Sequence, residues 1–143
     1  MTGITIHMIV PGADRASAWY RDVFGASERG RITLPDGRLL HVELHVSGTV
    51  LMLADEFPEH GGVRPPAGIT SAVAFYLDCD DVDAVWRKAI AAGATEHRPL
   101  QDTPFGERDG QILDPFGYRW GLTQHLRDVS YEEMNSAAAD MFG

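Results

Sequence analysis

The feature that most constrains the fold of this chain is an internal repeat of one amphipathic helix pattern. In the first copy, apolar residues recur at the i, i+3, i+4, i+7 and i+8 spacing of a helix with one apolar face: Ala16, Trp19, Tyr20, Val23 and Phe24. The second copy keeps the same spacing: Val82, Val85, Trp86, Ala89 and Ile90. Both patterns are followed by Gly-Ala, where glycine can take the left-handed conformation that ends a helix. The chain is therefore predicted to contain two copies of one structural unit. Asp14 is the predicted N-cap of the first helix.

Each predicted helix is preceded by one strand-like segment and followed by three more. In the first copy these segments are residues 4–10, 28–34, 39–46 and 49–54; in the second they are residues 72–79, 95–100, 110–113 and 118–124. The order βαβββ thus occurs twice, which predicts an α+β fold.

The predicted units are the parts of one domain spanning residues 1–143. Module one covers residues 1–54, a Pro- and Gly-rich linker covers 55–69, and module two covers 70–126. In the C-terminal segment, residues 127–143, Ser130 and Glu133 have capping-box spacing and predict a helix from Ser130 to about Met141.

Composition excludes several classes of partner. Lys and Arg number 12 against 21 Asp and Glu, giving a net charge of -9, and the basic residues do not cluster, so we expect no nucleic acid partner. No apolar segment approaches the roughly 20 residues of a membrane helix, and a signal peptide pattern is lacking. We expect no membrane association and a cytoplasmic location. The single cysteine, Cys79, excludes an intrachain disulfide and is expected to be a buried structural thiol.

Three segments carry a family resemblance: AWYRDVFGA at residues 18–26, LHVELHVSGTVLMLADE at 40–56 and DPFGYRWGL at 114–122. With the two βαβββ units they make residues 4–126 resemble the vicinal oxygen chelate superfamily of glyoxalases, bleomycin resistance proteins and dioxygenases, especially its PhnB-like branch. The resemblance implies that two modules curl their mixed sheets into a cup with the helices outside. It also implies a divalent metal with one ligand from each of four strands, and frequent homodimers.

The metal ligands of that family are not carried by this chain. The resemblance places the four ligand positions near Thr5, Met52, Ala74 and Gly121. Met, Ala and Gly provide no oxygen or imidazole donor, and His7, two residues beyond Thr5, is one ligand only. We expect no metal at the usual site and no cofactor, with a divalent metal at an unusual site as the alternative.

Residues 40–46 alternate strictly and therefore separate into two faces. Leu40 and the valines and leucine that follow it are predicted to face the helix, while His41, Glu43 and His45 share the opposite face with His7. His41 and Glu43 are candidate catalytic residues for acid/base chemistry, and His7 and His45 are candidate ligand-binding residues. The four could also form a metal site of imidazoles and a carboxylate. The remaining interpretation is a sheet face made polar for solubility.

Further candidate ligand-binding residues lie elsewhere in the predicted cup: Met52, Tyr76, Phe105, Arg108 and Arg119. The Arg108 guanidinium could hold a carboxylate or phosphate in bidentate fashion, and the alternative is a salt bridge to a neighbouring acid.

The leading hypothesis is a protein that binds a small organic molecule in its cup without the usual metal, with a second copy of the chain as partner. The alternatives are a metal-dependent lyase or dioxygenase, or a metal-free isomerase, that uses His7, His41, Glu43 and His45. A dimerising structural protein is a third. One fold hosts many functions, so the sequence does not decide whether the chain is an enzyme.

Overall fold

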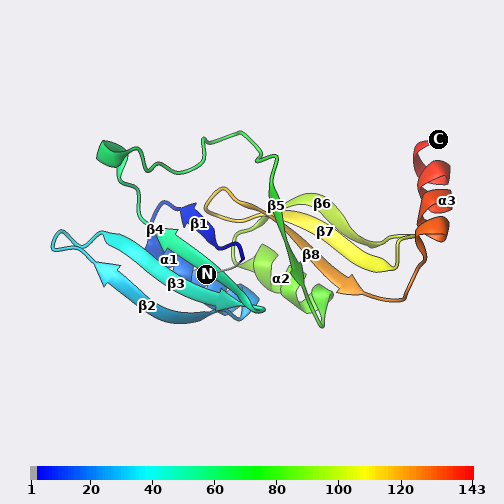
Figure 1. Ribbon diagram of the computed structural model, residues 1–143, viewed down its shortest axis with the longest axis horizontal. Coiled ribbons are helices and arrows are strands. Elements are labelled where there is room, and N and C mark those ends of the chain that lie inside the picture. Colours follow the sequence, from blue (N-terminus) through cyan, green and yellow to red (C-terminus); the bar gives the residue numbers. More distant parts are fainter. Residues whose placement is uncertain (1–2) are drawn as a thin grey trace. The chain divides into compact units, whose positions relative to one another are not determined.

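The structure, a computed structural model, describes residues 3–143 and divides them into two compact units. The first unit contains the described residues up to Ala72 together with Asp114–Tyr118, and the second contains Val73–Leu113 and Arg119–Gly143. Figure 1 draws most of the first unit in blue to green and most of the second in green to red.

Unit 1 is one four-stranded mixed sheet with a helix. Its elements are β1 (Ile6–Ile9), α1 (Ala13–Phe24), β2 (Ser27–Thr33), β3 (Leu39–Val46) and β4 (Thr49–Ala54). The strand order is β1-β4-β3-β2, with β1 parallel to β4 and the other pairs antiparallel.

Unit 2 repeats this arrangement and adds a terminal helix. Its elements are β5 (Ala74–Asp78), α2 (Val82–Ala91), β6 (Thr95–Asp102), β7 (Glu107–Leu113), β8 (Arg119–His125) and α3 (Tyr131–Phe142). The order β5-β8-β7-β6 and the strand directions match those of unit 1. The predicted α+β fold with two βαβββ modules is therefore confirmed.

The core of unit 1 lies between α1 and one face of its sheet. Met8, Val42, Leu44 and Leu53 are fully buried there, together with Tyr20 of α1. The Tyr20 hydroxyl donates a hydrogen bond to the buried Asp114 carboxylate. This bond ties α1 to the turn that precedes β8, which explains why that turn belongs to unit 1.

The N-terminus of α1 is capped from a distant part of the chain. The prediction that Asp14 caps the helix is wrong: the N-cap residue is Gly12, and Asp14 lies inside the first turn. The backbone N–H of Ala13 instead donates to Asp55 Oδ1 at 2.6 Å. Asp55 also accepts from Leu39 N at 2.6 Å, so one carboxylate fastens the ends of β4, β3 and α1 together.

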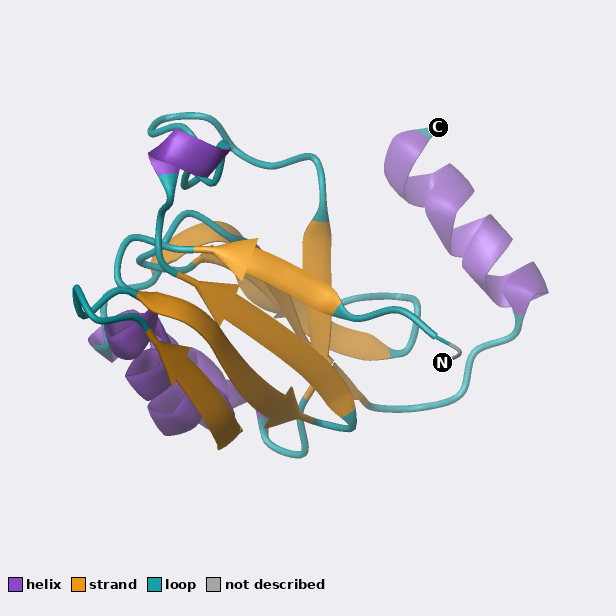
Figure 2. Ribbon diagram, turned by 60° about the vertical axis from the view of Figure 1, so that its left-hand side comes forward, coloured by secondary structure: helices purple, strands orange, loops and turns teal. Residues whose placement is uncertain are grey.

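The helices of unit 2 differ in how they are held. On the α2 face of the sheet, Leu77, Ile112 and Leu122 are buried, and Asp81 caps α2 by accepting from Ala84 N at 3.1 Å. In α3, by contrast, no side chain is buried, and Figure 2 shows a loop that separates this helix from the preceding strand. Its predicted cap is confirmed, because Ser130 Oγ accepts from Glu133 N at 3.1 Å. No helix within residues 3–143 is long and apolar enough to cross a membrane.

Candidate functional site

The sheet face of unit 1 opposite α1 carries a row of three side chains from adjacent strands. His7 of β1 pairs in register with Met52 of β4, and Met52 pairs with Glu43 of β3. Residues in register on neighbouring strands point to the same face, so the three share one surface. His7 is exposed, and Met52 and Glu43 are half-buried.

Glu43 also contacts the next polar residue of its own strand. Glu43 Oε2 lies 2.8 Å from His45 Nε2, and about a third of each side chain is exposed. His41, two residues before Glu43, is half-buried on the same face. The predicted grouping of His7, His41, Glu43 and His45 on one face of the sheet is thus what the structure contains. A carboxylate that holds an imidazole is an arrangement suited to orienting a general base.

A cavity of about 360 Å³ opens at the end of this face, next to His7. The residues that line it come from β1, the β2–β3 turn, the ends of β3 and β4, and residues 57–62: His7, Ile9, Leu34, Arg38, Leu40, Ala54, Asp55, Phe57, Glu59, His60 and Gly62. Its walls are mainly apolar, with polar groups at a few points. Such a lining is typical of small-molecule sites, whose volumes are about 300–1,000 Å³.

Leu40 reaches this cavity because of a β-bulge. The pairing of β2 with β3 runs from Ile32–His41 to Thr33–Leu39 and leaves Leu40 without a partner strand residue. As a result Leu39 is 4% exposed and faces the core, whereas Leu40 is 47% exposed. The prediction that Leu40 faces the helix is therefore wrong, since the extra residue reverses the alternation at this point.

The charged groups of the cavity are already paired. The Arg38 guanidinium donates to Asp36 at 2.9 Å and to Glu59 at 2.6 Å, and it lies over the Phe57 ring at 4.3 Å from the centroid. The two oxygens of Asp55 accept the backbone bonds described above. Polar recognition in the cavity is therefore left mainly to the imidazoles of His7 and His60.

Residues 57–62 are more ordered than the sequence suggests. The prediction treats residues 55–69 as a linker without packed structure, but Phe57 and Gly62 exchange two backbone hydrogen bonds around the 3₁₀ turn Pro58–His60. Phe57 and His60 line the cavity, although no local sequence pattern assigns a role to either residue. A phenylalanine among prolines and glycines was the available signal, because an apolar ring in a polar loop usually packs against something.

The positions expected for metal ligands do not fit a metal. Met52 and Ala74 lie on β4 and β5, and Gly121 of β8 is covered by the Tyr76 ring. A Cβ added at Gly121 would lie 2.6 Å from Tyr76 Cζ, so a carboxylate side chain could not occupy this position beside the ring. Within residues 3–143, no three His, Cys, Asp or Glu side chains are placed to hold a metal ion.

The candidate residues of unit 2 do not all share a face. Tyr76 lies on the face opposite α2, and half-buried Arg119 is in register with Ala74 on that face. Phe105 is half-buried in the turn between β6 and β7. Arg108 lies on the α2 side, where it donates to Asp83 of α2 at 3.0 Å and to Asp102 at 3.0 Å. Arg108 thus forms salt bridges with neighbouring acids, which is the alternative given above, and it lies on the sheet face opposite to that of Tyr76.

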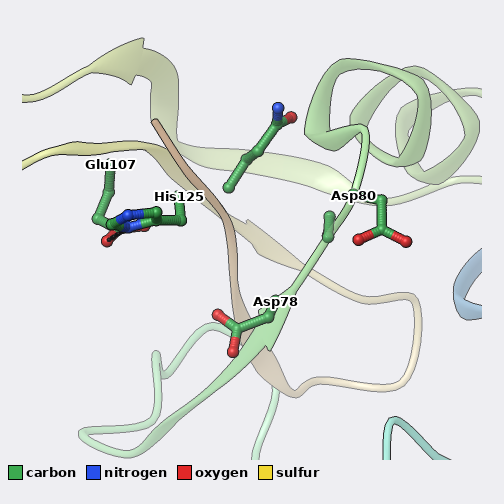
Figure 3. A pocket seen from close by; sticks show the side chains of 6 residues that line it. Asp78, Asp80, Glu107 and His125 are labelled. Atoms are coloured by element: carbon green, nitrogen blue, oxygen red, sulfur yellow. Dashed lines mark hydrogen bonds and ion pairs between the residues drawn. The ribbon is translucent and has the colours of Figure 1, made fainter. Parts of the chain in front are cut away.

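Unit 2 also has an acidic recess of about 480 Å³ near the end of β8, lined by Asp78, Cys79, Asp80, Glu107, Gln124 and His125. Figure 3 shows Glu107 and His125 together on one side and Asp78 and Asp80 on the other. His125 contacts Glu107 at 3.1 Å and Asp128 at 2.9 Å, and these carboxylates raise the imidazole pKa. This recess is polar, unlike the cavity of unit 1.

The sequence of this chain is similar to those of known proteins. The family model described as Glyoxalase/Bleomycin resistance protein/Dioxygenase superfamily matches residues 4–122. An uncharacterized protein of Mycobacterium bovis is 37% identical over 134 residues, which is 92% of this chain and 88% of that protein.

Solved structures share the fold of this chain. TioX from Micromonospora sp. ML1 is 27% identical with a TM-score of 0.65 and covers 88% of this chain and 100% of its own. A PhnB protein from Bacillus cereus, described as a putative 3-demethylubiquinone-9 3-methyltransferase, shares the fold at 22% identity and a TM-score of 0.68, over 86% of this chain and 99% of its own. The chain belongs to the glyoxalase, bleomycin resistance protein and dioxygenase superfamily.

Proposed function

We propose that the chain binds a small organic molecule in the unit 1 cavity and along the adjoining face, using its own side chains and no divalent metal. The observation that carries the proposal is the apolar cavity of about 360 Å³ that begins at His7. The pairing of its charged groups favours an uncharged or weakly polar ligand, because an ionic ligand would find no unmatched charge.

The two imidazoles determine how a ligand is oriented in this site. Apolar walls supplied by Leu34, Leu40 and Phe57 hold the body of a ligand, and His7 and His60 offer hydrogen bonds at its polar end. His7 also connects the cavity to the row formed with Met52 and Glu43, so a longer ligand extends across β4 towards β3.

A thermal-shift screen of uncharged organic compounds tests this proposal. We expect saturable stabilisation by some compounds, because a ligand at 100 times its Kd raises the free energy of unfolding by about 2.7 kcal/mol. His7→Ala and Leu40→Ala should weaken those compounds by roughly tenfold or more, which removes about 1.4 kcal/mol of that stabilisation.

Matched variants control for general effects on stability. His97→Ala removes an exposed imidazole from β6, and Ile69→Ala removes an exposed isoleucine that does not line the cavity. Both should leave the ligand shifts intact. The proposal fails when no compound stabilises the protein saturably, or when the cavity variants and their controls respond alike.

A second candidate function, metal-free proton transfer, is favoured by the 2.8 Å contact between His45 Nε2 and Glu43 Oε2. If the Nε2–H of a neutral imidazole donates to Glu43, Nδ1 is left as the acceptor that removes a proton from a ligand carbon. The proton then resides on His45 until it returns to the ligand, as in an isomerisation.

Deuterium exchange into a compound from the screen tests this chemistry in D₂O. We expect NMR to show exchange of a carbon-bound proton next to a carbonyl, with loss in His45→Gln and a large reduction in Glu43→Gln while binding persists. Equal exchange in the wild type and in His45→Gln would rule out His45 as the base.

We propose also that the chain forms a homodimer, as proteins with this resemblance often do. The exposed apolar side chains of α3, Tyr131, Met141 and Phe142, support an association that covers them.

A further inference from the structure

Tyr76 of β5 occupies a position that only glycine at residue 121 permits. The two residues are in register on neighbouring strands, and the ring lies across Gly121. A Cβ at residue 121 would lie 2.6 Å from Tyr76 Cζ, nearer than Cβ atoms approach other atoms. Gly121 therefore provides the seat for the ring, on the sheet face opposite α2.

The Tyr76 hydroxyl is held at the far end of this seat by two donors. Gln111 Nε2 donates to the hydroxyl oxygen at 2.8 Å, and Arg98 Nη2 donates to it at 3.4 Å. Gln111 is the in-register partner of Gly121, and Arg98 is the partner of Gln111, so the cluster is one row across four strands. The charge of Arg98 is matched by Asp109 at 2.8 Å.

These two hydrogen bonds determine which further hydrogen bond the Tyr76 hydroxyl can form. A phenol oxygen has two lone pairs and one proton, and the two N–H groups occupy the lone pairs. The O–H proton is then directed towards a further acceptor. Tyr76 is 54% exposed, so such an acceptor can approach from outside the sheet.

We propose that the Tyr76 hydroxyl is a ligand-binding hydrogen-bond donor for a carbonyl oxygen of an uncharged organic molecule. The ligand must accept a hydrogen bond, because the lone pairs of the phenol are taken. Since Arg98 is paired with Asp109, a carboxylate gains little over a neutral carbonyl at this position. All the residues of this row belong to unit 2.

The test uses full-length protein labelled with ¹³C at tyrosine Cζ and titrated with N,N-dimethylacetamide, a carbonyl acceptor without donors. Tyr76→Phe identifies the Tyr76 signal by its loss. We expect that signal to shift saturably, with a Kd in the millimolar range typical of a small fragment, about 1–100 mM. Tetramethylammonium, a cation without an acceptor, should leave it unchanged.

Two variants test separately the packing of the Tyr76 ring on Gly121 and the hydrogen bonds that the Tyr76 hydroxyl accepts. Gly121→Ala displaces the ring, and Gln111→Leu removes one donor that orients the hydroxyl; each should weaken the amide by several-fold up to roughly tenfold, the worth of one hydrogen bond. The signals of the other tyrosines report that each variant is folded. Ile69→Ala, which changes an exposed side chain outside this row of residues, should leave the amide response intact.

The proposal is overturned by an amide response that never saturates, by an equal response to tetramethylammonium, or by undiminished binding in folded Gly121→Ala. Acetate that binds more than roughly tenfold tighter than the amide would overturn the assignment to an uncharged acceptor.

Discussion

At the scale of single residues, surroundings decide whether a side chain reacts, and Cys79 shows this directly. Burial raises the pKa of the Cys79 thiol from 9.0 to about 11, and the neighbouring carboxylates Asp78, Asp80 and Asp81 act in the same direction. The thiolate is the nucleophilic form, so Cys79 should be inert near neutral pH although it lines the acidic recess.

Alkylation with iodoacetamide near pH 8 should therefore be roughly 100-fold slower for the native protein than for the chain unfolded in urea, because a thiol pKa of about 11 in place of 9.0 lowers the thiolate fraction by that factor. The native rate should keep rising with pH until about 11. Mass spectrometry measures both rates. Native Cys79 that reacts as fast as the unfolded chain would contradict the structure.

The candidate site was only partly predictable at this scale. Alternation along residues 40–46 brings His41, Glu43 and His45 to one face as expected, because the strand is regular there. The face on which Leu40 lies was not predictable, because the bulge depends on how β2 pairs with β3. The placement of the hydrogen-bond donors beside the Tyr76 hydroxyl depends on the register of four strands. No local sequence pattern predicts this register.

At the scale of elements, contact between β7 and its neighbours depends on Gly110. A Cβ added there would lie 2.8 Å from Leu100 N and Cα on β6 and 2.8 Å from Trp86 Cζ3 on α2. Backbone atoms cannot move aside as a side chain can, so the sheet and α2 would have to separate.

Gly110→Ala should accordingly lower the free energy of unfolding by about 1–3 kcal/mol, the usual cost of overpacking. Gly30→Ala is the matched control, because Gly30 lies on β2 with open space at its Cβ; that change should stay within about 0.5 kcal/mol. Urea denaturation measures both. A Gly110→Ala protein as stable as the wild type would refute the close packing of α2 on β6 and β7.

Element order was predictable because the helical repeat and the strand alternation are local patterns. The bounds predicted for residues 39–46 and 49–54 are those of β3 and β4, where Ser47-Gly48 sets the turn. Prediction failed where the deciding contact is distant. Asp55 caps α1 across 42 residues, and β7 begins at Glu107, three residues before the predicted start, because its partners lie on β6 and β8.

At the scale of the whole molecule, the proposed homodimer has a direct consequence for mass. Light scattering at micromolar concentration should give twice the 15.7 kDa of one chain. Tyr131→Asp combined with Phe142→Asp should shift the mass towards that of one chain, because charges on α3 oppose the burial of its apolar residues. A wild-type mass of 15.7 kDa would contradict the proposal.

The central claim for the whole molecule is that a member of this superfamily binds an organic ligand through its own side chains. Isothermal titration calorimetry, with the tightest-binding compound from the screen added to protein dialysed against EDTA, tests this claim most directly. We predict an unchanged Kd after dialysis and no gain on adding Mn²⁺ or Zn²⁺, with the Kd raised roughly tenfold or more in His7→Ala. Binding that disappears with EDTA and returns with a stoichiometric metal would contradict the claim.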